Sequence, residues 1–321
     1  MKFFSTKKYP AQIYLYGRTT DCDDSLAVRQ FRFNQKLAFV EIARKRGRVL
    51  PSAILNGADL TGLDLSGFDL SGSHFYRADL TSCNLHGADL RFSDLNRTYL
   101  HKCNFTDTLL GGATLWNASL EEVDLRRADF GDDANYGKVA DFAGASMIGV
   151  NLSGVRAKLL HFPRCDLSGA NLARVQASVT LNQANLEGAN LTDADLTGGD
   201  TGTQAYMERV RFYECKLVRT KLVGADLVGA TFNGSDLTGA DLSEACLEGS
   251  FICNANLSAA RFVNAHAALA KFRGSNLTGA DFTGADLRYA DLTGCILTGC
   301  NLTGADLTGV IGYAPNERTE K

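Results

Sequence analysis

A repeat of five residues runs through most of this chain and constrains its fold more than any other feature. From position 55 to position 130, every fifth residue is Leu or Phe, which gives 16 uninterrupted repeats. The residue two positions earlier is usually small, and the residue just before is often Asp or Asn, as in Ala58-Asp59-Leu60-Thr61-Gly62. A strict short period indicates a repeat architecture in which one unit is stacked many times.

Five residues match neither the period of a helix nor the two-residue period of a strand. We therefore expect each repeat to turn a corner, with the Leu or Phe and the small residue two before it pointing inward. Gly in the last position accepts the backbone angles of a tight turn, and the Ser or Thr before it can bond the turn backbone. Four repeats would close a square coil, and successive coils would stack about 4.8 Å apart, the distance between neighbouring strands.

The repeat motif A-[DN]-[LF]-[ST]-G resembles that of the pentapeptide-repeat family. The resemblance covers roughly residues 53–310. It implies the family's fold, an all-β solenoid that is a right-handed quadrilateral parallel β-helix, and at four repeats per coil we predict about 12 coils. The chain would then comprise an N-terminal segment (1–52), the β-helix (53–310) and a short C-terminal tail (311–321).

The N-terminal segment is predicted to cap the first coil with a helix over about 25–46. Phe33, Leu37 and Val40 form the face expected to cover the coil, because an end coil exposes apolar core and unpaired backbone. Three consecutive basic residues end this helix: Arg44, Lys45 and Arg46. They are either a solvated outer face or a contact for an acidic partner or phosphates.

Two stretches break the register of the repeat. It fails over 131–141 and resumes on Phe142, then fails over 199–209 and resumes on Phe212. Another 20 repeats run from Phe212 to Leu307. Loops on a rigid scaffold often carry binding residues, so these stretches are either binding loops or tolerated insertions. The candidate contact residues in them are Asp132, Asp133, Tyr136 and Tyr206.

An aromatic and arginine column is predicted on the outside of the first repeats. Residues 20 apart should lie on the same side, one coil further along, which stacks Tyr76 with Trp116 and Arg77 with Arg97. Aromatic residues and arginine are enriched in protein interfaces and often anchor them. The column is therefore a candidate partner-binding site, the alternative being the scattered exposed aromatics that many proteins carry.

No motif for catalysis or cofactor binding is found. The chain lacks the phosphate-binding G-x-x-x-x-G-K, the nucleophile elbow G-x-S-x-G and the zinc motif H-E-x-x-H. The repeat's own side chains should fill the core and leave little room for a substrate. The five histidines fall in outward positions without metal-ligand spacing: His74, His86, His101, His161 and His266. We predict a protein that is not an enzyme, with no catalytic residues, cofactor or metal site.

Six of the nine cysteines fall in the small inward position, where a thiol behaves as a small apolar group. These are Cys83, Cys103, Cys165, Cys215, Cys295 and Cys300. Cys246 and Cys253 fall in outward positions, and nothing in the sequence near them suggests an activated thiol.

The charge of the chain is unevenly distributed. Residues 1–50 hold 11 Lys and Arg against 4 Asp and Glu, whereas the remainder holds 22 against 32. An acidic repeat region argues against direct nucleic-acid binding along its sides, which needs clustered Lys and Arg. There is no secretory signal and no apolar run long enough to span a membrane, so we expect a cytoplasmic protein.

The family resemblance also carries an expectation about function. Some pentapeptide-repeat proteins bind type II topoisomerases, above all DNA gyrase, by resembling duplex DNA in width, twist and negative charge. The resemblance therefore implies that this chain is a non-catalytic protein-binding rod. The most specific function that it implies is that of a DNA mimic that modulates or protects gyrase or another DNA-processing enzyme. The alternative is a bacterial or phage scaffold or effector that docks a non-nucleic-acid protein through the loops, the exposed aromatics or the basic helix. A poorly covered last coil would also allow two copies to form a homodimer.

Overall fold

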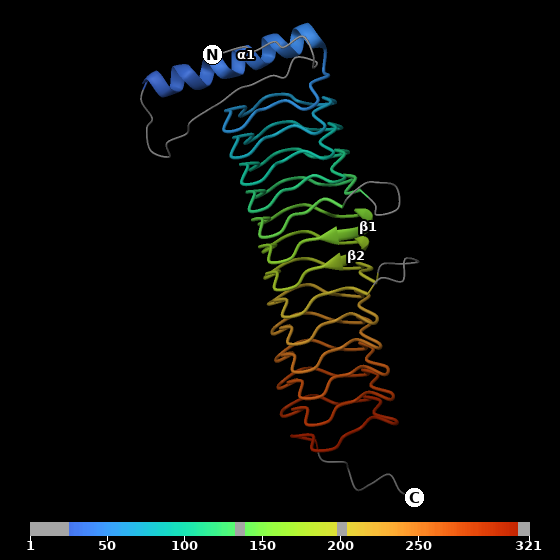
Figure 1. Ribbon diagram of the computed structural model, residues 1–321. Helices are drawn as coiled ribbons and strands as arrows, with labels where there is room; N and C mark the ends of the chain where they lie inside the picture. The colour runs from blue at the N-terminus through green and yellow to red at the C-terminus, as the bar shows by residue number, and fades with distance from the viewer. Residues whose placement is uncertain (1–25, 132–138, 198–203, 314–321) are drawn as a thin grey trace, which may run out of the picture. The chain divides into compact units, whose positions relative to one another are not determined.

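The computed structural model describes residues 26–131, 139–197 and 204–313. It divides the chain into two compact units, Met1–Leu167 and Ser168–Lys321, here called unit 1 and unit 2. Helix α1 (Leu26–Arg46) and strand β1 (Arg156–His161) belong to unit 1, and strand β2 (Gln176–Thr180) belongs to unit 2 (Figure 1). The rest of each unit consists of stacked coils whose repeats are joined by single bridges, parallel except for that between Ser178 and Thr197.

The coils of unit 1 follow the predicted register. From Val49 to Leu109, the residue just before each inward Leu or Phe pairs with the residue 20 positions later, as Ile54 pairs with His74 and His74 pairs with Asp94. The amide of Leu55 donates to the carbonyl of His74 at 2.7 Å, and the amide of His74 donates to the carbonyl of Ala53 at 2.8 Å. These ladders pair the backbone of one coil with the next and build the predicted right-handed quadrilateral β-helix.

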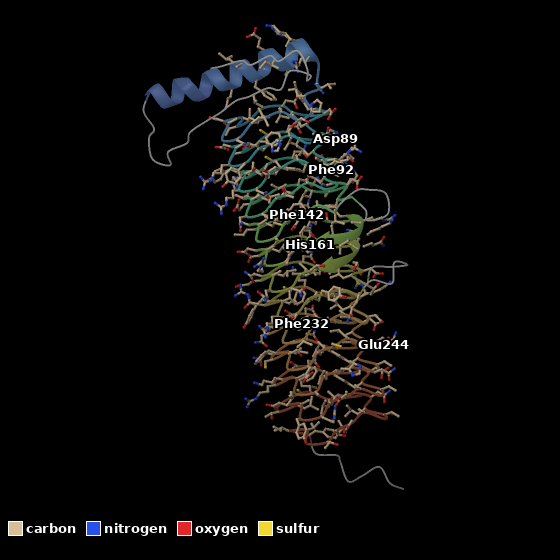
Figure 2. The ribbon with its side chains drawn as sticks, in the orientation of Figure 1. Asp89, Phe92, Phe142, His161, Phe232 and Glu244 are labelled. Atoms are coloured by element: carbon tan, nitrogen blue, oxygen red, sulfur yellow. The ribbon has the colours of Figure 1, made fainter. Side chains whose placement is uncertain are left out.

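The aromatic core of unit 1 includes three phenylalanines around the first break in the repeat. At this break the number of residues between paired positions increases, since Thr114 pairs with Asp141 rather than with a residue 20 positions later. Phe142 is fully buried, which confirms that the register resumes on it. Its ring packs 5.9 Å from that of Phe130 and 5.1 Å from that of Phe162. Phe92, by contrast, is 55% exposed; both Phe92 and Phe142 are labelled in Figure 2.

The small inward position carries a second set of hydrogen bonds. Several hydroxyls and thiols there donate to the carbonyl of the inward residue 23 positions earlier, as Thr98 does to Phe75 at 2.8 Å and Cys83 does to Leu60 at 3.0 Å. Burial raises the pKa of the Cys83 thiol to about 12, so the thiol stays protonated and can donate. Cys83, Cys103, Cys165 and Cys215 are buried, as predicted, and Cys295 and Cys300 are half-buried.

Two serines in this position of unit 2 provide a matched stability test. The hydroxyl of Ser275 donates to the carbonyl of Ile252 and accepts from the amide of Ala255, whereas the buried hydroxyl of Ser250 has no hydrogen-bond partner among the residues that the structure describes. We expect Ser275→Ala to lower the free energy of unfolding by about 1–3 kcal/mol because it leaves a buried amide unpaired. Ser250→Ala should be neutral or stabilising. Urea denaturation followed by circular dichroism measures both, and equal losses would contradict the assigned bonds.

The repeats of unit 2 resume earlier than the sequence pattern suggested. Met207 is fully buried in the inward position, Ala205 occupies the small position two before it, and Tyr206 pairs with Thr180 and Asp226. The prediction that the register is lost until Phe212 was therefore wrong. Methionine fills the inward position because its flexible side chain adapts to the space that Leu or Phe occupies elsewhere.

Helix α1 packs on the first coils with a different face from the one predicted (Figure 1). Phe39 is 1% exposed and its ring packs 6.1 Å from that of Phe68, while Lys36 Nζ lies 3.3 Å from Asp59 Oδ1. Leu37 and Val40, predicted to face the coil, are about half exposed. The side chain of Phe33, the third residue of that predicted face, lies outside the described residues.

Candidate functional site

The predicted aromatic and arginine column exists and lies at one corner of unit 1. We call it the Tyr76 corner, formed by residues 56–57, 76–77, 96–97 and 116–117. Asparagines of alternate coils fix its aromatic residues: Asn56 Oδ1 accepts from the amide of Tyr76 at 2.9 Å. Asn96 Oδ1 accepts in the same way from the amide of Trp116 at 2.8 Å. Tyr76 and Trp116 are thereby held two coils apart, a separation of about 10 Å at the spacing of paired strands.

The side chains of this corner are open to solvent. Tyr76 is 37% exposed and Trp116 is 49% exposed, and the guanidinium of Arg77 lies 5.4 Å from the centre of the Tyr76 ring. Arg77 and Arg97 have left-handed backbone angles, with φ of 57° and 56°, at the turn position where Gly is commonest. Among the described residues, neither arginine has an ion-pair partner. The corner thus combines exposed aromatic rings with two arginines that form no ion pair within the described part of the chain.

Tyr99 extends this surface and was missed by the sequence analysis. It is 49% exposed, follows Arg97 by two residues and pairs with Asp79 and Ser119 of the neighbouring coils. Its slot, just before an inward Leu, is the one usually filled by Asp or Asn. A large aromatic side chain in that outward slot was the signal that could have identified it.

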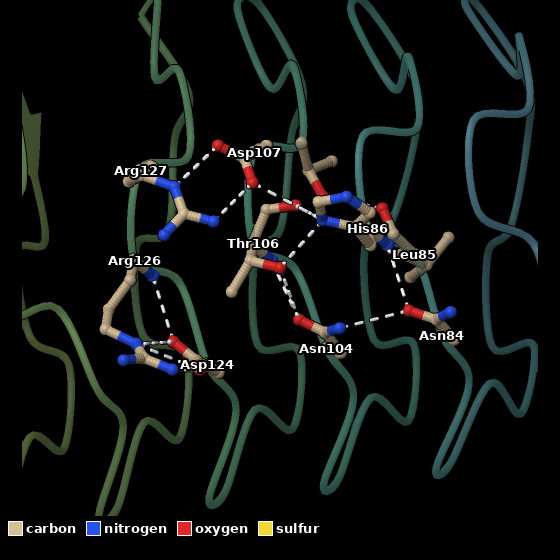
Figure 3. Close-up of polar contacts among 10 residues, drawn as sticks. Asn84, Leu85, His86, Asn104, Thr106, Asp107, Asp124, Arg126 and Arg127 are labelled. Carbon is tan, nitrogen blue, oxygen red and sulfur yellow. Dashed lines mark hydrogen bonds and ion pairs between the residues drawn. The ribbon is translucent and has the colours of Figure 1, made fainter.

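The arginines of another corner of unit 1 are paired, in contrast to those of the Tyr76 corner. Figure 3 shows Arg127 of this corner holding Asp107 through two hydrogen bonds of 2.7 and 2.6 Å. Arg126 likewise binds Asp124, with 2.7 Å between Nη2 and Oδ2. The Arg127 guanidinium lowers the pKa of the Asp107 carboxyl below its usual range. Side chains here neutralise one another and leave little charge for a partner.

The other predicted contact residues lie elsewhere or are not described. Arg44, Lys45 and Arg46 are exposed in the last turn of α1, and Lys45 Nζ lies 2.8 Å from Glu41 Oε1. Tyr206 belongs to unit 2 and is 48% exposed. Asp132, Asp133 and Tyr136 lie outside the described residues.

Unit 2 has an exposed apolar column that the sequence analysis also missed. Leu269 and Tyr289 are 52% and 59% exposed, one coil apart, and both have left-handed backbone angles. The Tyr289 ring lies over Gly309, because a Cβ on that glycine would come within 2.5 Å of it. Nearby in sequence, Lys271 Nζ lies 4.7 Å from the centre of the exposed Phe251 ring.

Most titratable side chains of the described residues are paired with neighbours in the coils. Within 26–131, 139–197 and 204–313, no group of three or more His, Cys, Asp or Glu side chains could hold a metal ion. The carboxylates and histidines of unit 1 mostly pair with neighbouring side chains or turn amides, as His86 Nδ1 does with Thr106 Oγ1 at 2.9 Å. In the same described ranges, no helix has the length and apolar character to cross a membrane.

Comparison with solved structures finds repeat proteins of the same kind. HetL from the cyanobacterium Nostoc sp. strain PCC 7120, a pentapeptide repeat protein involved in regulating heterocyst differentiation, is 25% identical, with 86% of this chain and 97% of HetL covered and a TM-score of 0.23. Rfr23 from the cyanobacterium Cyanothece 51142 is 26% identical over 35% of this chain and 88% of its own, with a TM-score of 0.33. QnrB1, a plasmid-mediated fluoroquinolone resistance protein, is 21% identical over 72% and 83%, with a TM-score of 0.19.

The family assignment rests on the repeats themselves. A search of curated proteins gave no match. The model of the family described as "Pentapeptide repeats" matches the chain in eight copies, at residues 53–91, 83–109, 103–132, 140–175, 165–200, 215–252, 253–288 and 275–311. These copies span most of the chain and coincide with the stacked coils of both units. The protein therefore belongs to the pentapeptide-repeat family.

Proposed function

We propose that this chain is a non-catalytic protein-binding module and that the Tyr76 corner contacts its partner. The observation that carries the proposal is the exposed cluster of Tyr76, Tyr99 and Trp116 around Arg77 and Arg97. Tyrosine, tryptophan and arginine are the residues that most often supply the binding energy of protein interfaces. The asparagine bonds hold the backbone of this corner in place, which reduces the entropy lost on binding.

A DNA mimic that binds gyrase or another DNA-processing enzyme is a second, more specific candidate. The excess of acidic residues favours it, since the chain after residue 50 holds 32 Asp and Glu against 22 Lys and Arg. Pairs such as Asp107 with Arg127 and Asp89 with Arg91 dilute that negative surface in unit 1. We therefore place the protein-binding role of the Tyr76 corner first.

Affinity capture from a bacterial lysate tests the first proposal and separates it from the second. The baits are the full chain, a Tyr76→Ala/Trp116→Ala variant and a Tyr289→Ala control that removes an exposed aromatic from unit 2. We expect a protein retained by the full chain and by the control to be lost from the double variant. Equal retention by all three baits would contradict the proposal. Displacement of the retained protein by duplex DNA would support the DNA-mimic candidate, and insensitivity to DNA would count against it.

A further inference from the structure

The geometry of the Tyr76 corner points to the class of partner that it binds. We propose that it binds an acidic amphipathic α-helix that lies along the direction in which the coils stack. This inference rests on the proposed function, because it names the partner of the same surface. It is carried by three features of the corner: its uncompensated charge, the fixed carboxylates on either side and the spacing of its aromatic rings.

The positive charges of Arg77 and Arg97 favour a partner with negative groups. Arg77 and Arg97 occupy the same turn position of successive coils, so their backbones lie about 4.8 Å apart. Like charges stacked in this way repel one another. No ion pair within the described residues compensates them, whereas Arg91 and Arg127 of the same unit are each held by a carboxylate. Two carboxylates on a partner would provide the missing compensation.

Fixed carboxylates on both sides of the arginines favour a protein partner over a nucleic acid. Asp79 follows Arg77 by two residues, and its Oδ1 accepts from the amide of Thr81 at 3.0 Å. Asp94 precedes Arg97 by three residues, and its Oδ1 accepts from the amide of Asn96 at 3.0 Å. These turn bonds hold both aspartates beside the column. The two aspartates would repel a continuous phosphate backbone laid along the column. Two separate carboxylates of a protein can contact the arginines without lying against the aspartates.

The spacing of the aromatic rings matches a helix better than an extended strand. Tyr76 and Trp116 are two coils apart, about 9.6 Å. On a helix, residues seven apart are separated by about 10.5 Å on one face, and the residues three and four along lie midway between them. Apolar residues at i and i+7 would then meet the two rings. An acidic residue at i+3 or i+4 would meet Arg97, which lies midway between the rings, and a second acidic residue beside position i would meet Arg77, which follows Tyr76 in the same coil. On a strand, the residues about 10 Å apart point to opposite faces.

A displayed library tests this inference on the full chain. The probe is a stable helical scaffold on phage, with one exposed face of one helix randomised and no tryptophan. We expect selected helices to place apolar residues seven apart with Asp or Glu between them, and to bind the Arg77→Glu/Arg97→Glu variant at least 10-fold more weakly. Replacing the acidic residues of a selected helix with lysine should restore its binding to that variant. Selected helices without an acidic bias, or equal binding to both proteins, would overturn the inference.

Two further readouts locate the binding and separate the two proposals. Trp116 is the only tryptophan of the chain, so its fluorescence reports on this corner directly and should change as a selected helix is titrated in. Arg164→Glu is the matched control, because Arg164 is an exposed arginine of unit 1 in the same left-handed turn position, with φ of 58°. If the captured partner is lost from Tyr76→Ala/Trp116→Ala but kept by Arg77→Glu/Arg97→Glu, the acidic-helix inference fails and the proposed function stands.

Discussion

Replacing Phe142 with alanine is expected to lower the free energy of unfolding by about 3–5 kcal/mol. The side chain is fully buried, and its ring packs against those of Phe130 and Phe162 at 5.9 and 5.1 Å. Alanine would leave a cavity between neighbouring coils, and the stability of a repeat protein depends on the contact of each coil with the next. Urea denaturation of the full chain, followed by circular dichroism, measures the loss.

Two other variants show whether such a loss comes from the core. Phe92 is 55% exposed with its ring over Gly112, so Phe92→Ala should change the free energy of unfolding by no more than about 0.5 kcal/mol. Phe142→Leu should be milder than Phe142→Ala, because Leu fills the same inward position in most coils. Similar denaturation midpoints for Phe142→Ala and Phe92→Ala would show that the inward assignment of Phe142 is wrong.

Replacing Trp116 with alanine is expected to weaken binding of the captured partner by about 30-fold or more, equivalent to about 2 kcal/mol. Half of the Trp116 side chain is exposed in the free protein and available to a partner. The amide of residue 116 would still donate to Asn96 Oδ1, so the fold should be preserved. Isothermal titration calorimetry with the purified partner measures the affinity.

The matched control for this variant is Tyr289→Ala, which removes an exposed aromatic ring from unit 2. Its affinity for the partner should equal that of the unchanged chain within a factor of about two. An equal loss in both variants would contradict a specific role of Trp116, and a loss in Tyr289→Ala alone would move the interface to the apolar column of unit 2. A denaturation midpoint for Trp116→Ala equal to that of the unchanged chain confirms that the loss concerns binding.

The repeat made the path of the chain predictable, because one inward residue in five determines which side chains form the core. The pairing of Ile54 with His74 follows from the 20-residue spacing between coils. The burial of Phe142 follows from the five-residue register of the repeats after the break. Prediction failed at Met207, where an unusual residue fills the inward position. It also failed for the covering face of α1, where Phe39 packs on the coil and Leu37 does not. The periodicity of a helix sequence does not determine the angle at which the helix packs on its neighbour, and this angle decides which of its residues are buried.

The candidate site was only partly predictable, for a related reason. The 20-residue spacing was enough to stack Tyr76 with Trp116 and Arg77 with Arg97. It does not tell which arginines find a carboxylate, since that depends on how side chains reach across the turns, as Arg127 reaches Asp107. Tyr99 was missed because its slot, just before an inward Leu, usually holds Asp or Asn, and the aromatic residue that departs from this pattern was not taken as a signal.

Hydroxyl-radical footprinting of the chain with and without its captured partner tests the central claim most directly. The method oxidises exposed aromatic side chains, and mass spectrometry assigns the oxidation to individual residues. Tyr76, Tyr99 and Trp116 are exposed in the free chain and should be oxidised less in the complex, while Tyr289 should be unchanged. If these three residues are oxidised equally in both states while other residues become protected, the partner binds elsewhere and the Tyr76 corner is not its interface.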